Sequence, residues 1–319
     1  MTAIVVVGAG VVGLTAALRL LEDGHDVEVW TKDDPESTVS AVAAAIWFPY
    51  AAGPRDAVLR WSALARTRFE ALYAVPDSGV TPCEGLLVVR AATEPWWRPL
   101  LPDWRAAPHE RVPAGAIAAD VATLPVAEMP VFLAWLQREI TRRGGRVVRR
   151  SIVSIDDAFA LHDVVVLCTG LASRELVPDA SVHPIRGQVV VVDRRTTTFV
   201  LDDDHPDGMT YVIPRSHDCV LGGTHGAHDE DRAPRAAETE AIRARCVDLV
   251  PALDAARTRQ VKVGLRPGRP TVRVEAEHVT TARGRGLLVH DYGHGGSGMT
   301  LSFGCAEDVA RLVREHAPA

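Results

Sequence analysis

The chain has 319 residues, a length at which we expect two domains with separate buried cores. Its composition, 47% hydrophobic and 24% charged, is typical of a soluble globular protein. The net charge of −6 argues against nucleic acid or an acidic membrane surface as the main partner. No apolar run approaches the roughly 20 residues that span a membrane. The five cysteines are scattered and form no C-x-x-C pair, so we expect a reduced, cytoplasmic protein.

The first thirty residues predict a β-α-β unit. "AIVVVGAG" (3–10) is an apolar, β-branched strand that ends in glycines. "VVGLTAALRLLEDG" (11–24) has helical periodicity and stops at a glycine, and "HDVEVW" (25–30) is a second strand. Units of this kind build parallel sheets.

The pattern then changes twice along the chain. Residues 51–130 are rich in Pro and Trp, without a β-α rhythm, and "MPVFLAWLQREITRRGG" (129–145) predicts a helix. "RVVRRSIVSI" (146–155) and "DVVVLCTG" (163–170) predict strands of a buried sheet. From 186 to 282, alternating strands predict an antiparallel sheet interrupted by one helix around 235–250. A strand, a glycine-rich loop and a helix fill 286–316.

The chain is therefore expected to alternate between two domains of an α/β protein. We assign a Rossmann-type nucleotide-binding domain to residues 1–50, 131–182 and 285–319. An interleaved α+β substrate domain with a large antiparallel sheet takes residues 51–130 and 183–284.

Three glycines in "GAGVVG" carry the strongest motif. Gly8, Gly10 and Gly13 have G-x-G-x-x-G spacing directly between a strand and a helix. The first allows a tight turn, the second lets a pyrophosphate approach the backbone, and the third packs the helix on the strand. The helix N-terminus adds N–H groups and a positive dipole. For the ribose, Asp33 and Asp34 are the candidates, although Thr31 and Lys32 lie nearer to the strand.

Two further stretches point to a planar ligand. In "STVSAVAAAIWFPY" (37–50), the hydroxyls of Ser37, Thr38 and Ser40 precede small residues that can lie along a ring system. An Ala-rich helix packed in a core is the alternative. "DYGHGGSGMT" (291–300) places four glycines between a strand and the last helix, where the backbone has to come very close to something.

Several blocks together resemble the FAD-dependent D-amino acid oxidase family over essentially the whole chain. They are, in order, "VVVGAGVVGLTAAL", "VAAAIWFPY", "VVLCTG", "RGQVVVVD", "TYVIP", "GLRPGRPTVR" and "DYGHGGSGMT". The resemblance implies FAD as cofactor, with the late glycine loop against the isoalloxazine ring. The implied cofactor-binding residues are Gly8, Ala9, Gly10, Val11, Val12, Gly13, Asp33, Ser37, Thr38, Ser40, Ala44, Ala45, Ile46, Ile152, Thr169, Arg266, Gly295, Gly296, Gly298, Met299 and Thr300.

The same resemblance supplies a substrate site. Arg266 in "VGLRPGRP" can bind a carboxylate bidentately, Tyr211 would give it a second hydrogen bond, and the carbonyl of Gly296 would accept the amine. We expect hydride transfer from the substrate Cα to flavin N5, with no side-chain base. The products would be a 2-oxo acid and ammonia, after hydrolysis of an imino acid, and hydrogen peroxide from O₂.

Individual residues bear on which substrate side chain is preferred. His225 lies where a D-aspartate oxidase tends to have Arg, and the orientation of Arg215 is open, so we expect neutral D-amino acids. D-aspartate oxidase, a glycine or sarcosine oxidase, and a non-enzymatic flavin-binding sensor are the alternatives. The segment 201–211, at the family's lid, is short. We expect no bound metal, since "HGAH" (225–228) reads as surface and His294 as ordering its loop. A homodimer is possible from the family.

Overall fold

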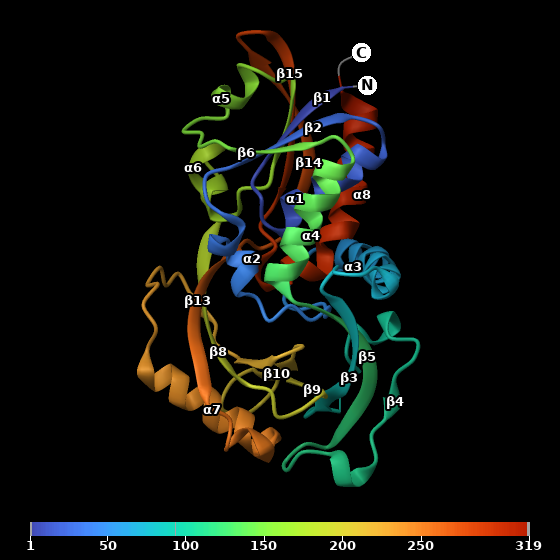
Figure 1. Cartoon of the computed structure of the whole chain (residues 1–319), viewed down its shortest axis with the longest axis vertical. Coiled ribbons are helices and arrows are strands. Elements are labelled where there is room, and N and C mark those ends of the chain that lie inside the picture. Colours follow the sequence, from blue (N-terminus) through green and yellow to red (C-terminus); the bar gives the residue numbers. More distant parts are fainter. Residues whose placement is uncertain (1, 93, 318–319) are drawn as a thin grey trace.

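The computed structural model describes residues 2–92 and 94–317, and one half of it is built on a six-stranded sheet (Figure 1). Its strand order is β14 (Arg273–Thr281), β15 (Gly284–Tyr292), β7 (Val164–Leu167), β1 (Ala3–Val7), β2 (Asp26–Thr31) and β6 (Arg146–Arg149). All neighbours are parallel except β14 and β15. The predicted β-α-β unit is confirmed as β1, α1 (Val11–Glu22) and β2.

Both faces of this sheet are covered, as the continuous apolar runs require. Ile4 and Val6 of β1 pack with helices α1, α4 (Met129–Arg142) and α8 (Gly298–His316). Val5 and Val7 point to the other face, toward the short helix α5 (Asp156–Phe159) and the segment that carries α6 (Ser173–Leu176). No described helix is long and apolar enough to cross a membrane.

The other half is a nine-stranded, mostly antiparallel sheet. Its order is β12 (Gly226–Ala227), β8 (His183–Asp193), β11 (Asp218–Gly222), β10 (Thr210–Pro214), β9 (Phe199–Asp202), β3 (Val80–Val89), β5 (Ala118–Ala127) and β4 (Arg105–Ala106), with β13 (Thr258–Gly268) also paired to β8. Only β3 and β9 are parallel to each other. Helix α7 (Ala236–Leu249), predicted around 235–250, packs on this sheet through Ile242 and Cys246.

Two strand predictions are wrong. One strand lies in the other sheet, and the other strand is shorter than predicted. The segment 271–282 was expected in the antiparallel sheet, but it forms β14 and pairs with β15 in the six-stranded sheet. The reason is the two-residue connection at 282–283, which folds β14 directly back onto the strand that follows it. The predicted strand 146–155 ends at Arg149, and residues 150–155 form a loop.

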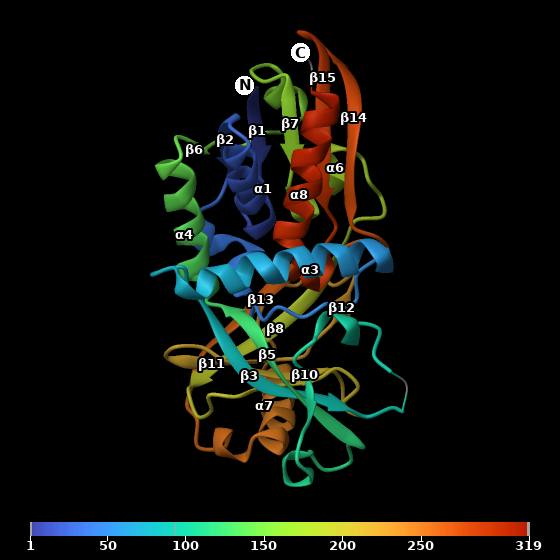
Figure 2. The same cartoon turned by 90° about the vertical axis from the view of Figure 1, so that its right-hand side faces the viewer.

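Two helices lie near the boundary between the sheets. Helix α3 (Arg55–Ala71) crosses the molecule between its halves (Figure 2). It packs closely on α8, because a side chain at Gly304 would come within 2.2 Å of the Trp61 carbonyl. The short helix α2 (Val39–Val42) precedes a segment that also runs between the sheets. The carboxyl ends of β1, β7 and β15 therefore face the antiparallel sheet across a cavity.

Candidate active site

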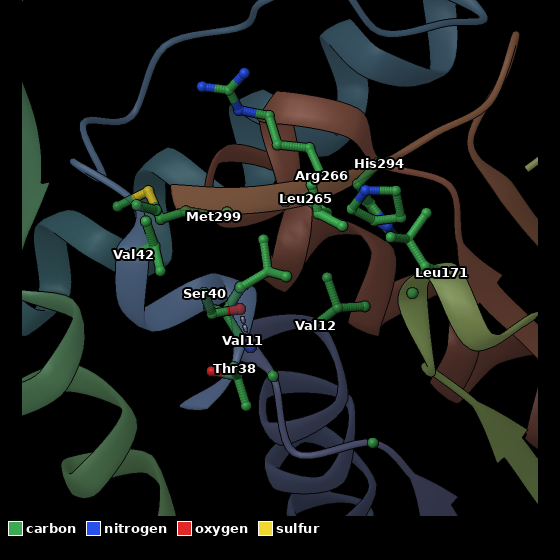
Figure 3. Close-up of a pocket in the computed structure, with 18 of the residues that line it drawn as sticks. Val11, Val12, Thr38, Ser40, Val42, Leu171, Leu265, Arg266, His294 and Met299 are labelled. Atoms are coloured by element: carbon green, nitrogen blue, oxygen red, sulfur yellow. Dashed lines mark hydrogen bonds between the residues drawn. The ribbon is translucent and has the colours of Figure 1, made fainter. Parts of the chain in front are cut away.

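A cavity of about 470 Å³ lies between the two sheets. Its walls come from the ends of β1, β7 and β15, from the segment 37–50, and from β9, β10 and β13. In Figure 3, Thr38 and Ser40 lie beside Val11 at one end and Arg266 lies at the other. The cofactor and substrate residues expected from the sequence line this cavity, except Gly13 and the second ribose candidate, Asp34.

The glycine motif has the local geometry that its spacing predicts. Gly8 has a φ of +114°, and a Cβ there would lie 2.3 Å from the carbonyl oxygen of Cys168, the residue that follows β7. At Gly13 a Cβ would lie 1.9 Å from the carbonyl oxygen of Gly8. Gly13 thus lets α1 pack on the strand behind the cavity wall, which is why it does not line the cavity.

The hydroxyl groups of the next segment are engaged with the backbone. Ser40 Oγ accepts a hydrogen bond from the N–H of Val11 at 3.0 Å, drawn in Figure 3. Thr38 Oγ1 donates to the carbonyl of Pro35 at 2.6 Å. Ser40 therefore satisfies one of the free N–H groups at the start of α1, the place at which a phosphate would bind.

The end of the cavity at β2 contains residues that the sequence reasoning missed. Asp33 lines it and lies 3.9 Å from Lys32, whereas Asp34 points to Arg149 and lies outside the lining. Asp33 is thus the better placed of the two ribose candidates. Ile152 also lines this end, as do Arg150 and Ser151, which the sequence did not single out. The guanidinium of Arg150 lies 4.4 Å from the ring centre of Trp30, a stacking contact that local pattern cannot reveal.

The small-residue segment is pinned on two sides. Ala45, with the unusual φ of 58°, accepts a hydrogen bond on its carbonyl from the N–H of Ala127 at 2.8 Å. The hydroxyl of Thr300 on α8 bonds both the N–H and the carbonyl of Phe48, at 3.1 and 2.9 Å. These contacts hold a strained backbone along the cavity. Only Val39–Val42 form a helical turn, so the Ala-rich helix considered from composition does not extend over residues 43–50.

A second helix N-terminus also ends on the cavity. The loop before α8 turns at Gly295 with a φ of 54°, and Gly298 and Met299 open the helix beside the lining. Ser297 anchors the loop by donating its hydroxyl to the carbonyl of Tyr50. Two positive helix ends thus converge on one cavity, an arrangement suited to a ligand with two electron-rich regions.

The predicted substrate residues lie together, each over a glycine. A Cβ at Gly187 would lie 2.4 Å from Arg266 Cζ, and a Cβ at Gly222 would lie 2.2 Å from Tyr211 Oη. Arg266 Nη1 donates to the carbonyl of Thr224 at 2.9 Å, which fixes the guanidinium. Burial raises the pKa of Tyr211, although the nearby Arg266 lowers it, so the phenol keeps its proton. The supporting glycines were not found from the sequence, because they are separate in the chain and meet these side chains only across strands.

The residues considered for side-chain selection differ in position. Arg215 pairs with Asp218 at 2.6 Å and does not line the cavity. His225 lines a separate space of about 50 Å³ that also touches Arg266. Burial and the Arg266 charge lower the pKa of His225, which keeps its ring neutral.

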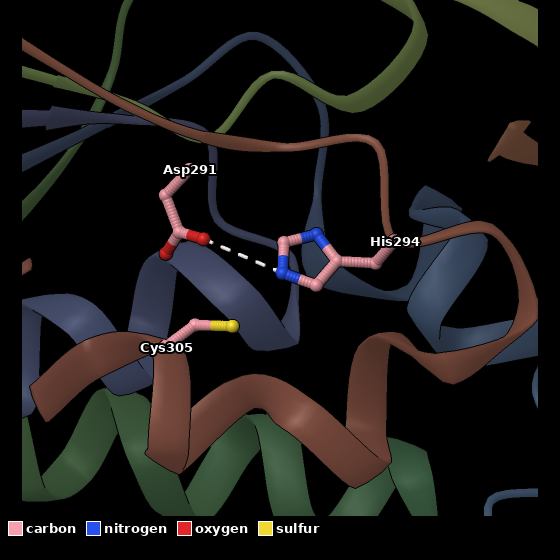
Figure 4. Close-up of side chains that lie close together, drawn as sticks. All are labelled: Asp291, His294 and Cys305. Carbon is pink, nitrogen blue, oxygen red and sulfur yellow. Dashed lines mark ion pairs between the residues drawn. The ribbon is translucent and has the colours of Figure 1, made fainter. Parts of the chain in front are cut away.

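Asp291, His294 and Cys305 form a buried cluster in which two residues of the segment 291–300 meet one residue of α8 (Figure 4). Asp291 Oδ1 lies 3.3 Å from His294 Nε2, and both side chains are almost fully buried. Ligand atoms of the three residues lie within 4.8 Å of one another, so they could hold a metal ion. Burial, however, raises the pKa of the Cys305 thiol well above its usual range, which disfavours the thiolate that a metal needs. The aspartate–histidine pair itself ties β15 to the loop, and the expectation of no metal stays a prediction.

Comparison with known proteins agrees with this geometry. A family model described as "FAD dependent oxidoreductase" matches residues 3–312. The chain belongs to this family. Within the FAD-dependent oxidoreductases, a D-amino-acid oxidase of Rubrobacter xylanophilus is 46% identical over 97% of this chain and 95% of that protein. D-aspartate oxidase of Homo sapiens is 34% identical over 98% of this chain and 94% of its own length.

A solved structure of another protein has the same fold as this chain. The crystal structure of glycine oxidase from Geobacillus kaustophilus covers 100% of this chain and 96% of its own, with a TM-score of 0.80 at 20% identity. The predicted fold class and cofactor are thereby confirmed. The residues present also fit FAD, because glycines that admit no Cβ, two helix N-termini and a flat backbone segment all face one cavity.

Proposed function

We propose that this chain is a D-amino-acid oxidase that converts neutral D-amino acids to 2-oxo acids, ammonia and hydrogen peroxide. Arg266 and Tyr211 lie over glycines in the same cavity that the dinucleotide motif lines from its other end. This placement is the observation that carries the proposal. The D-configuration rests on the relatives named D-amino-acid oxidase.

The substrate is held by its two charged groups. Arg266 binds the α-carboxylate with two parallel N–H donors, and the Tyr211 hydroxyl donates to the same carboxylate. The carbonyl of Gly296 accepts from the α-amine, which leaves Cα facing the flat segment around Ala45. Bound FAD supplies the acceptor for the hydride from Cα and is regenerated by O₂.

No side-chain base is required by this arrangement. The protein contributes proximity and orientation, since three contacts fix the substrate at both polar ends. The walls of the cavity near Tyr211 are apolar, formed by Leu201, Met209 and Ile213. These side chains exclude water from the reacting carbon and accommodate an uncharged side chain.

The surroundings of Arg215 and His225 favour neutral over acidic substrates. A second carboxylate needs a second cation, but Arg215 is engaged with Asp218 and His225 is neutral. A D-aspartate oxidase activity is the alternative, since a relative with that name is 34% identical.

Anaerobic spectroscopy tests the function directly. The purified protein should show flavin absorbance that D-alanine bleaches, while L-alanine and D-aspartate do not. Bleaching by D-aspartate alone would identify a D-aspartate oxidase. Bleaching by glycine or sarcosine alone would identify a glycine or sarcosine oxidase. A protein that carries FAD but is bleached by none of these would act as a binding protein, and the proposal would be wrong.

We also propose a location in the cell and an oligomeric state. All five cysteines are buried and free, which is in keeping with a reducing, cytoplasmic location. We propose a homodimer by family resemblance, to be checked by light scattering on the FAD-loaded protein.

A further inference from the structure

One end of the cavity is formed where the neighbouring strands β2 and β6 stop. The two strands are parallel, and Thr31 lies opposite Arg149 in their register. Directly after this pair, the backbone N–H of Arg150 donates to the carbonyl of Thr31 at 2.8 Å. Arg150 and Ile152 line the cavity together with residues 30–33. The segment that follows β6 is therefore attached to the end of β2, and the two form one wall.

Trp30 gives this wall a fixed, flat base. Its side chain is fully buried, and its Nε1 donates to a carboxylate oxygen of Glu28 at 2.7 Å. The ring of His162 meets it edge-on, with 5.5 Å between the ring centres. The guanidinium carbon of Arg150 lies 4.4 Å from the centre of the same indole ring. Because the indole is held by these contacts, it holds the stacked guanidinium in one place.

The charge of Arg150 has no acidic partner within residues 2–92 and 94–317. Its neighbour Arg149 has one, since its guanidinium lies 3.2 Å from a carboxylate oxygen of Asp34. Arg150 is exposed, although it lines the cavity and stacks on Trp30. Its guanidinium is thus oriented by an aromatic ring, and no ion pair within the described chain competes with a ligand for it.

The position of Arg150 in the sheet determines which part of a dinucleotide it can meet. The pyrophosphate belongs at the glycine turn after β1, and the first ribose belongs at the end of β2. Strand β6 follows β2 in the sheet order, so it lies two strand spacings, about 10 Å, from β1. The group that lies beyond the ribose is the adenine ring. Nucleobases stack on the planes of arginine guanidinium groups.

We propose that Arg150, held on Trp30, is a binding residue on which the adenine ring of FAD stacks. Indole, guanidinium and adenine then form three successive layers at the end of β2 and β6. The inference concerns the cofactor and goes beyond the proposed function, since it holds whichever amino acid is oxidised. A lysine at this position would supply the charge but not the plane.

The test separates stacking from charge by titrating the apoprotein with three ligands. FAD and ADP carry adenine, whereas FMN does not; flavin fluorescence reports FAD and FMN binding, and calorimetry reports ADP binding. Arg150→Met still covers Trp30 with an unbranched side chain, and we expect it to bind FAD and ADP about tenfold more weakly and FMN equally well. Arg150→Lys keeps the charge, and we expect it to bind FAD at least about fivefold more weakly than the wild type does.

Arg149→Met is the matched control. Arg149 adjoins Arg150, carries the same charge, is exposed and does not line the cavity. Its variant should keep the Kd for FAD within about twofold of the wild-type value. A wild-type Kd for FAD in Arg150→Met or in Arg150→Lys would overturn the inference. An equal loss of FMN affinity, or an equal loss of FAD affinity in Arg149→Met, would also overturn it. These titrations contain no amino acid, so their outcome is independent of the bleaching experiment that tests the proposed function.

Discussion

Gly187 should control substrate binding without touching the substrate. Its φ is not in the left-handed region, so alanine there causes no backbone strain, but the new Cβ would lie 2.4 Å from Arg266 Cζ. Ordinary contact begins at 3.4 Å, so the guanidinium has to move by about 1 Å. A misplacement of about 1 Å can cost on the order of 100-fold in rate, or about 2.7 kcal/mol. We expect Gly187→Ala to lower kcat/KM for D-alanine by roughly that factor.

The assay is peroxide release under steady-state conditions, with flavin content and melting temperature recorded for each variant. Gly226→Ala is the control, since Gly226 lies on β12, which pairs with β8 next to Gly187, and its Cβ would meet nothing closer than 3.3 Å. In an Arg266→Ala background the Gly187 substitution should have no further effect, because the group it displaces is gone. A kcat/KM within about threefold of wild type, or an undiminished effect in that background, would refute the reasoning.

Three more outcomes are expected. Arg266→Lys should raise KM for D-alanine about tenfold or more, because an ammonium cannot bind a carboxylate bidentately; an unchanged KM would contradict the clamp. Gly13→Ala should weaken FAD binding, measured by flavin fluorescence on the apoprotein, since its Cβ would overlap a carbonyl at 1.9 Å. Asp308→Asn should lower stability by about 2 kcal/mol at pH 7, because Asp308 accepts charge-assisted hydrogen bonds from Arg60 and one from Trp61 on α3. Burial alone would raise the pKa of Asp308, but these bonds lower it, so the difference in melting temperature should shrink as the pH falls below about 4.

The parts of the fold with local sequence signals could be predicted from the sequence. Strand, glycine turn and helix follow one another at 3–22, so spacing alone identifies the nucleotide motif and the packing role of Gly13. The same holds for the loop before α8, where glycine density signals close approach of the backbone. The expected cofactor and substrate residues other than Gly13 and Asp34 line one cavity, and their roles stay proposals.

What the sequence could not provide depends on pairing between distant strands. Gly187 and Gly222 matter only because β13 and β10 bring Arg266 and Tyr211 over them. The assignment of β14 to the wrong sheet has the same origin, since an alternating strand has the same period in either sheet.

The two contacts between the segment 48–50 and the loop and helix at 297–300 set the order in which the molecule can be completed. Phe48 and Tyr50 are held by Thr300 and Ser297, about 250 positions later in the chain. During synthesis the glycine motif leaves the ribosome first, yet its cavity lacks a wall until the last helix has emerged. A nascent chain that has not yet exposed α8 lacks the Thr300 and Ser297 contacts that hold this wall, and we expect it to bind FAD more weakly than the folded protein does.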